Sequence, residues 1–257
     1  MDLGLKGKNA IISGGTHGIG RSIALSLANE GCNVCVFSRD RKKVNDMSNE
    51  IKGIKKLCFE VDVLNKFSLN KLVDKIIDAW GTIDILINNV GGGGRWGKEN
   101  IEDTSEDVWQ EVYDKNVTSA RILTMRVIPY MRKNKWGRVI TIASILGKEG
   151  GGRPWFNMAK SSQISLMKTL AMTSYLVRDG ITFNTVAPGA IMIPDTGWEK
   201  EKNKNLLSFR KKNEELPLGR MGTPDEVANV VVFLCSELSS LVNGSCVTVD
   251  GGESRSF

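Results

Sequence analysis

Short runs of apolar residues alternate along this chain with longer stretches in which apolar positions recur every three or four residues. The short runs have the length of buried strands, and the longer stretches have the period of amphipathic helices. Seven strands are predicted, at Asn9–Ser13, Asn33–Ser38, Lys56–Val61, Ile83–Asn88, Arg138–Ala143, Ile181–Val186 and Ser245–Val249. Six helices are predicted between them, at about Gly18–Asn29, Lys42–Lys52, Phe67–Trp80, Ser105–Lys133, Trp155–Arg178 and Asp225–Glu237. Alternation of this kind predicts an α/β fold, a parallel sheet with helices on both faces.

One segment breaks the alternation. Residues 191–218 contain no clear strand and are rich in lysine, arginine, acids and asparagine. Two interpretations stay open for this segment. It is either a solvated surface helix or a substrate lid, because long insertions in compact domains are often functional. The sequence contains no linker, repeat or low-complexity tract, so we expect residues 1–257 to form one domain.

Composition narrows the class of protein. The chain has 257 residues, of which 41% are hydrophobic, enough for a large α/β core. No apolar run approaches the ~20 residues of a membrane span, and the first residues lack a signal-peptide layout. The net charge of +6 is mild, and no basic stripe is interleaved with aromatic residues. We therefore expect a cytoplasmic protein that binds neither membranes nor nucleic acid.

Cysteine and histidine usage excludes several kinds of site. The five cysteines are an odd number, which argues against a disulfide framework. Cys32 and Cys35 have the spacing of a redox pair but fall at the start of a strand, so we interpret them as core residues. His17 is the single histidine, which removes most metal clusters and any Ser/His/Asp triad elsewhere in the chain. No metal is expected.

The first strand leads into a glycine-rich turn and then into a helix. Gly14, Gly18 and Gly20 occupy this turn. A strand–turn–helix presents free backbone N–H groups at a helix N-terminus, where a phosphate is favoured. Glycine allows positive φ angles and lets a ligand approach the backbone closely. The context predicts a dinucleotide site at the carboxyl ends of the strands.

The spacing Gly14-x-x-x-Gly18-x-Gly20 resembles the T-G-x-x-x-G-x-G pattern of the short-chain dehydrogenase/reductase family, with Ser13 at the threonine position. Asn88-Asn89-Val90-Gly91 is similar to the family's N-N-A-G turn, and Pro188-Gly189 to its P-G segment. The resemblance covers nearly the whole chain, and its general pattern is similar to that of 3-oxoacyl-carrier-protein reductases. It implies a single-domain, doubly wound Rossmann fold with a seven-stranded parallel sheet, assembled as a homotetramer or homodimer.

The end of the second strand bears on the choice of cofactor. NAD-binding domains usually place Asp or Glu there to accept hydrogen bonds from the ribose, whereas a guanidinium suits a 2′-phosphate. This chain has Phe37, Ser38 and Arg39 at that point, and His17 as a second basic contact, so we expect NADP. Asp40 keeps NAD open as the less favoured option. With the positions that the resemblance implies, the expected cofactor-binding residues are Gly14, Thr16, His17, Gly18, Ile19, Gly20, Ser38, Arg39, Asp62, Val63, Asn89, Val90, Gly91, Lys160, Pro188, Gly189 and Ile191.

The resemblance also implies a catalytic set. In the family a tyrosine delivers the proton to a carbonyl oxygen, and a lysine four residues later lowers the pKa of that tyrosine. A serine hydrogen-bonds the substrate oxygen, and an asparagine holds a water that continues the proton relay. Asn116, Ser144 and Lys160 match three of these positions, but Phe156 stands where the tyrosine is expected. Residues 156 and 160 are one helical turn apart and so share a face.

Phe156 keeps the aromatic ring and loses the hydroxyl, and losing a general acid costs ~10²–10⁴ in rate. Three explanations stay open. The residue is a deliberate change from tyrosine, or another donor such as a water relayed from Lys160 and Asn116 replaces the phenol, or the chain binds its ligand without catalysis. No tyrosine is an obvious substitute, since the three in the chain, Tyr113, Tyr130 and Tyr175, lie in helical segments away from the expected site.

Two segments near the expected pocket pair an arginine with an indole. Arg95-Trp96 follows a run of glycines, and Arg153-Pro154-Trp155 precedes the catalytic helix. Arg153 suits a phosphate or carboxylate and Trp155 a sugar face, while surface ordering is the other interpretation. The second segment resembles reductases of bacterial surface-sugar pathways.

The expected function is therefore that of an NADP-dependent oxidoreductase that interconverts a ketone and a secondary alcohol. The expected substrate is a small molecule, anionic or derived from a sugar. A 3-oxoacyl-carrier-protein reductase-like enzyme and a catalytically impaired nucleotide-binding member are the alternatives.

Overall fold

The computed structural model describes residues 1–256, and these contain one seven-stranded sheet. The strand order is β3-β2-β1-β4-β5-β6-β7, and every neighbouring pair is parallel. The strands are β1 (Asn9–Ser13), β2 (Asn33–Ser38), β3 (Lys56–Glu60), β4 (Ile85–Asn88), β5 (Gly137–Ile142), β6 (Ile181–Pro188) and β7 (Cys246–Val249). The predicted fold class and the seven parallel strands are confirmed.

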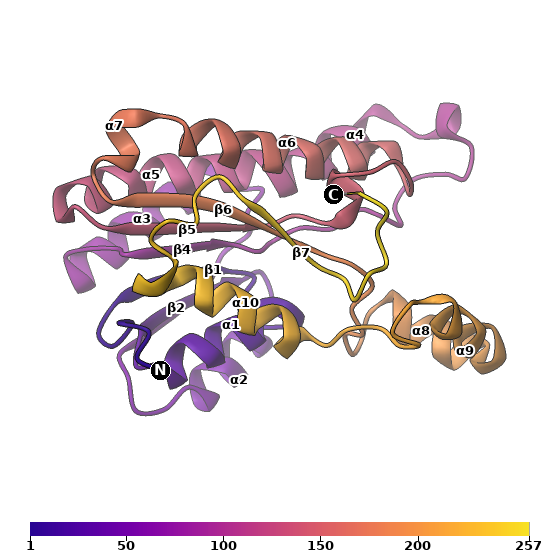
Figure 1. Ribbon diagram of the computed structural model, residues 1–257, viewed down its shortest axis with the longest axis horizontal. Coiled ribbons are helices and arrows are strands. Elements are labelled where there is room, and N and C mark those ends of the chain that lie inside the picture. The colour runs from indigo at the N-terminus through magenta and orange to yellow at the C-terminus, as the bar shows by residue number, and fades with distance from the viewer. Residues whose placement is uncertain (257) are drawn as a thin grey trace.

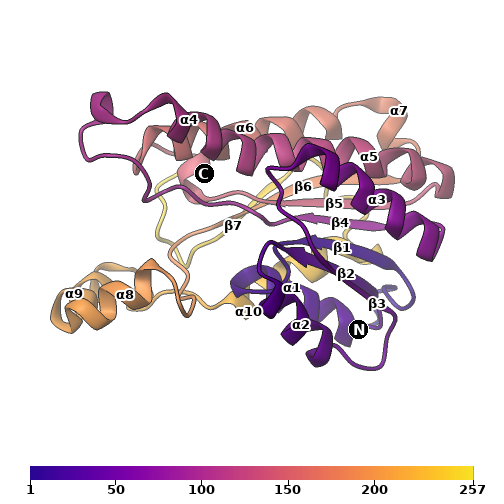
Figure 2. The ribbon, with the colours of Figure 1, turned by 180° about the vertical axis from the view of Figure 1, so that it is seen from behind.

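Helices cover both faces of the sheet, as Figures 1 and 2 show. One layer holds α1 (Gly18–Asn29), α2 (Arg41–Glu50) and α10 (Pro224–Cys235), and the other holds α3 (Lys66–Trp80), α5 (Ser119–Asn134) and α6 (Pro154–Ala171). The remaining helices are α4 (Glu106–Tyr113), α7 (Ser174–Val177), α8 (Gly197–Lys204) and α9 (Leu206–Glu215). No helix within residues 1–256 combines the length and the apolar character needed to cross a bilayer.

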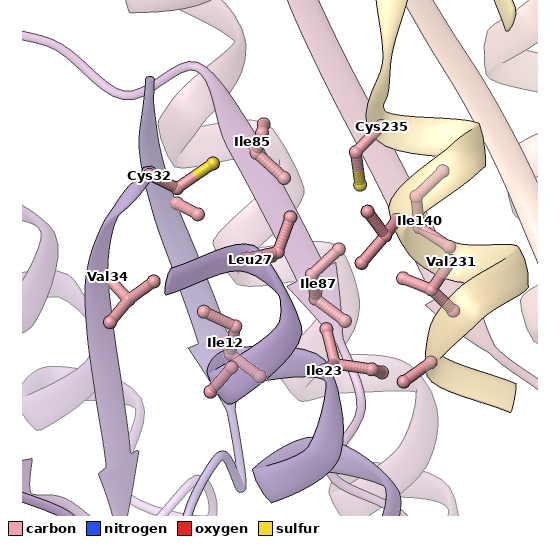
Figure 3. Packing of buried hydrophobic residues seen from close by; sticks show 14 of the residues in the cluster. Ile12, Ile23, Leu27, Cys32, Val34, Ile85, Ile87, Ile140, Val231 and Cys235 are labelled. Carbon is pink, nitrogen blue, oxygen red and sulfur yellow. The ribbon is translucent and has the colours of Figure 1, made fainter. Parts of the chain in front are cut away.

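The two layers enclose separate cores because successive strand residues point to opposite faces. Ile12 and Ile87 face α1 and α10, whereas their neighbours Ile11 and Leu86 face α3, α5 and α6. Figure 3 shows Ile23 and other apolar side chains of the first core packed between the sheet and its helices. The central strands are buried on both sides, which explains why their sequences are almost continuously apolar.

Two long helices of the sequence prediction are wrong in their extent. The predicted helix Ser105–Lys133 is interrupted by a π-turn at Asp114–Thr118, between α4 and α5. The predicted helix Trp155–Arg178 ends earlier, at the end of α6, and a single turn, α7, follows. A π-turn adds one residue to a helical turn, and such turns are frequent at functional sites.

Residues 191–218 form a helical hairpin of α8 and α9 that projects from the body of the molecule (Figures 1 and 2). Phe209 is the one buried residue of these two helices. The hairpin is therefore held by few core contacts, which agrees with the polar, lysine-rich sequence.

Candidate active site

A groove of about 1040 Å³ lies beside the carboxyl ends of β1, β4, β5 and β6. Strand order reverses between β1 and β4, and α/β sheets bind ligands outside such a reversal. The predicted residues that line the groove are Gly14, Thr16, His17, Gly18, Ile19, Ser38, Arg39, Asp62, Val63, Asn89, Val90, Gly91, Ser144, Phe156, Lys160, Pro188, Gly189 and Ile191. Gly20 and Asn116 lie outside this lining, and both contact residues that belong to it.

The glycine-rich turn folds so tightly that side chains have no room. Gly14 and Gly18 have left-handed φ angles of 64° and 54°. A Cβ on Gly20 would lie 2.3 Å from Asn89 Nδ2 and 2.4 Å from the Gly14 carbonyl oxygen. No side chain among the described residues caps α1, and its first turn has no acidic residue. The turn thus fits the pyrophosphate of a dinucleotide, which the N–H groups at the start of α1 would hold.

Ser13 supports the turn that follows β4. Its Oγ accepts hydrogen bonds from the backbone N–H of Asn89 and Val90, at 2.9 and 3.0 Å. It also donates to the Ile87 carbonyl oxygen at 3.3 Å. The Asn89 amide in turn donates to the Ser13 carbonyl at 2.9 Å. These bonds join β1 to β4 beneath the groove. The backbone there accommodates Ser13 and Val90, two residues that differ from the family's sequence pattern.

Arg39 is the basic residue that directly follows β2. It is exposed, it lines the groove, and no ion-pair partner for it occurs within residues 1–256. Phe37 is fully buried, and the Asp40 carboxylate caps α2 by accepting from Lys43 N at 3.1 Å. Ser38 Oγ accepts from the Thr16 hydroxyl at 3.0 Å, which ties this edge to the glycine turn. A guanidinium that forms no ion pair within the described residues suits a 2′-phosphate.

Lys115 is a groove residue that the sequence did not reveal. It stands in the π-turn, half-buried, with Nζ 4.5 Å from the centroid of the Trp96 ring. Burial, with a smaller contribution from the charge of Arg39, lowers the pKa of Lys115. In the sequence, only its position next to Asn116 indicated that Lys115 lies near the site. The π-turn shows that its side chain reaches the groove.

Lys160 lies on the floor of the groove, 4% exposed. Its Nζ donates to the Ile142 carbonyl and to Gln163 Oε1, each at 2.9 Å. Burial lowers the pKa of Lys160 to about 7. Ser144 and Phe156 also line the groove, and the Phe156 ring centroid is 5.5 Å from Lys160 Nζ. The floor therefore holds the Lys160 amine, which can exchange a proton near neutral pH, beside the Phe156 ring, which cannot.

Asn116 is fully buried in the π-turn, and its polar atoms are all engaged. Its Nδ2 donates to the carbonyl oxygens of Gly92 and Val112, at 2.9 and 2.7 Å, and its Oδ1 accepts from Gly92 N at 3.3 Å. Its backbone carbonyl accepts from Gln163 Nε2 at 2.7 Å. Asn116 thus holds the glycine-rich loop after β4 in place.

The two arginine–indole segments have different positions. Arg95 and Trp96 line the groove, but Arg153 and Trp155 do not. Trp155 is fully buried, with its Nε1 donating to the Gly93 carbonyl at 3.1 Å. Neither interpretation of Trp155, sugar stacking or surface ordering, is correct, because the indole fills the space between α4 and α6. Arg153 is also removed from the pocket, since it donates to the Glu99 carbonyl at 3.0 Å.

The α8–α9 hairpin meets the groove at its mouth, where Trp198 and Lys200 belong to the lining. Arg95 Nη1 forms an ion pair with Glu201 Oε1 at 2.6 Å, and the Arg95 guanidinium lies 4.6 Å from the centroid of the Trp198 ring. Lys212 of α9 pairs with Glu201 Oε2 at 3.1 Å. One arginine thus fastens the hairpin to the loop on the other side of the groove.

Comparison with known proteins places the chain among oxidoreductases. The family model described as "Enoyl-(Acyl carrier protein) reductase" matches residues 14–254. A 3-oxoacyl-acyl-carrier-protein reductase of Aquifex aeolicus is 35% identical over 98% of this chain and 99% of its own length. L-sorbose reductase of Gluconobacter frateurii, solved with NADPH and L-sorbose, superimposes with a TM-score of 0.92 at 30% identity, covering 100% of both chains. A 7α-hydroxysteroid dehydrogenase solved with NADH gives a TM-score of 0.87 at 31% identity, covering 98% of this chain and 96% of its own.

Proposed function

The chain belongs to the short-chain dehydrogenase/reductase family, and from this premise we propose that it is an NADP(H)-dependent oxidoreductase. It interconverts a ketone and a secondary alcohol on a small anionic or sugar-derived substrate. The observation that carries this proposal is the single groove that joins the glycine turn, Arg39, Ser144 and Lys160. The NADPH and L-sorbose complex of the Gluconobacter frateurii relative supports the same cofactor and a polar substrate.

The chain's own residues supply the proton and the orientation of the substrate. A bound nicotinamide supplies the hydride. Lys160 holds a proton at Nζ near neutral pH, because burial brings its pKa to about 7. Ser144 lines the groove with a hydroxyl that can donate to the substrate oxygen. With Phe156 in place of a phenol, we infer that the proton reaches the carbonyl oxygen from Lys160, directly or through one water.

The charge at the mouth of the groove supports an anionic substrate. Arg95 and Lys200 line the groove at the α8–α9 hairpin, and Lys115 lines it between Trp96 and the charge of Arg39. Such cations favour a phosphate or carboxylate group. A panel of neutral, carboxylated and phosphorylated ketones and keto-sugars, with NADPH oxidation as the readout, tests this function. Failure of the protein to bind NADPH at all would remove the proposal.

Replacement of Arg39 by aspartate is expected to weaken NADPH binding by about 10²-fold and to leave NADH binding unchanged or tighter. The change removes a charge-assisted hydrogen bond to the 2′-phosphate and adds a repelling carboxylate. Fluorescence titration with both nucleotides measures the effect. Arg41→Asp is the matched control, because Arg41 is exposed at the start of α2 and does not line the groove. Equal losses in the two variants would mean that the effect is one of net charge alone.

Arg95→Ala is expected to raise the KM for an anionic ketone by about tenfold with a smaller change in kcat, because a charged hydrogen bond is lost. The hairpin also loses its ion pair with the loop after β4. Steady-state kinetics with a charged and a neutral ketone separate the two roles. A rise in KM for the charged ketone alone indicates substrate binding, and a rise for both indicates a lid. Lys202→Ala, on α8 but outside the groove lining, should change neither.

Two other candidate functions are each supported by one specific observation. The 35% identity to the Aquifex aeolicus protein supports a 3-oxoacyl-carrier-protein reductase-like enzyme, which the ketone panel tests if it includes an acyl thioester. Phe156 supports a member that binds nucleotide without turnover. A protein that binds NADPH tightly but reduces no ketone of the panel would fit that second function.

We also propose that the chain forms a homotetramer or homodimer. Met125 of α5 and Met158 of α6 are each more than two-fifths exposed, although both belong to helices that pack on the sheet. Apolar side chains left in solvent by a helix layer favour burial against a second copy.

A further inference from the structure

We propose that Gln163 is a positioning residue for Lys160: its side-chain amide bridges Lys160 Nζ and the Asn116 carbonyl, and so directs the remaining N–H of Lys160 into the groove. This inference rests on the proposed function of Lys160 as the group that holds the proton. Gln163 does not line the groove and carries no charge, so neither the motifs nor the lining assign it a role.

The bridge is complete at both ends. Gln163 Oε1 accepts from Lys160 Nζ at 2.9 Å, and Gln163 Nε2 donates to the Asn116 carbonyl at 2.7 Å. Gln163 is 1% exposed, and its two partners are 4% and 0% exposed. The opposite orientation of the amide would put two oxygens together at one end and two donors at the other. The partners therefore fix the orientation, and the oxygen faces the lysine.

The bridge leaves one N–H of a protonated Lys160 without a partner among the described residues. An ammonium has three donors, and the Ile142 carbonyl and Gln163 Oε1 take two of them. Nζ also lies against the backbone of Gly91, where an added Cβ would be 2.9 Å away. Lys160 and Gly91 both line the groove, so the third donor is available to a ligand there.

Within residues 1–256, burial and not another ionisable side chain lowers the pKa of Lys160. The π-turn packed beside it carries Asp114, which accepts from Thr118 and Gln110, and Lys115, which lies over Trp96. After β5, Lys148 donates to Thr248 instead. On α6 itself the neighbours are Phe156 and Gln163. The neutral amide of Gln163 is therefore the neighbouring side chain whose replacement should change the pKa of Lys160.

The test measures the titration midpoint of Lys160 by NMR of lysine labelled with ¹³C at Cε, with Lys160→Met to assign the signal. Gln163→Glu is expected to raise the midpoint by at least one pH unit, because an adjacent carboxylate favours the ammonium. Gln163→Met is expected to lower it, because an acceptor is lost. Asn184→Leu is the control, because Asn184 is a fully buried amide that bridges Val242 O and Ser245 N away from the groove.

Wild-type protein supplies a second measurement that does not depend on how the variants fold. The side-chain ¹⁵N amide signal of Gln163 is expected to shift with the same midpoint as Lys160. The proposal is overturned if that signal does not follow the lysine, or if folded Gln163 variants titrate like wild type. A separate NADPH titration distinguishes this failure from that of the proposed function. Loss of nucleotide binding in wild type removes the function and leaves the bridge, whereas tight binding with unchanged midpoints removes only the bridge.

Discussion

Phe156→Tyr raises the rate of carbonyl reduction, with an expected gain of ~10²–10⁴-fold in kcat, the usual contribution of a positioned general acid. The phenol would stand on a ring whose centroid is 5.5 Å from Lys160 Nζ, and a nearby ammonium lowers the pKa of a phenol. The ring is already held in place, since it packs beside Trp155 and close to Gly94. The added hydroxyl therefore takes up a defined position. NADPH oxidation with the best ketone of the panel measures the gain.

Phe156→Leu is the control for this experiment, because it removes the ring and supplies no acid. Comparable turnover in wild type and the leucine variant, with a large gain in the tyrosine variant, would show that the native ring has no role in proton transfer. Turnover in the tyrosine variant alone would identify the native chain as a nucleotide binder. If the tyrosine variant binds NADPH and remains as slow as wild type, position 156 does not face the reacting oxygen.

Lys160→Met is expected to reduce turnover by at least ~10²-fold, because it removes the proton-holding group from the floor of the groove. It should also change how stability depends on pH. The pKa of Lys160 is about 7 in the folded chain, against 10.5 for an ordinary lysine. Between these values the unfolded chain binds more protons, so the stability of wild type rises with pH by up to about 1.4 kcal/mol per pH unit relative to the variant. Below pH 7 both states are protonated, and the difference is constant.

Urea unfolding of the two proteins, below pH 7 and at several values between 7 and 10.5, measures this slope. Lys168→Met is the matched control, because Lys168 is exposed on the same helix and should give no pH-dependent difference. Parallel stability curves for wild type and Lys160→Met would mean that the buried amine keeps an ordinary pKa, and the proposed proton source would then fail.

The sequence predicted well those features that depend on local pattern. β1, β2 and α1 begin and end where their apolar runs predict, and the glycine turn between β1 and α1 follows from residues adjacent in the chain. The π-turn was missed because the apolar period of the flanking helices continues across it. Nothing in that period shows one extra residue in the backbone turn.

Features that depend on tertiary contacts were predicted less well. Trp155 follows Pro154 at the start of α6, and the sequence does not show which way that first turn faces; the structure turns the indole into the core. The contact of Arg95 with Glu201 joins residues 106 positions apart. Gln163 gave a usable signal, since it lies on the same helix face as Phe156 and Lys160. A polar residue that is buried on an otherwise apolar helix face needs a hydrogen-bond partner.

The π-turn between α4 and α5 limits how this stretch can vary in length. A regular helix there would need one residue fewer, so deleting one residue within Asp114–Thr118 would turn the π-turn into an ordinary helical turn and leave the side chains of α5 in register. Val127 and Met131 would then stay in the core, whereas Asn116, which lies within the turn, would lose its hydrogen bonds to the loop after β4. The extra residue of the π-turn therefore serves the groove and not the core, while the hairpin, with one buried residue, can change in length at little cost to stability.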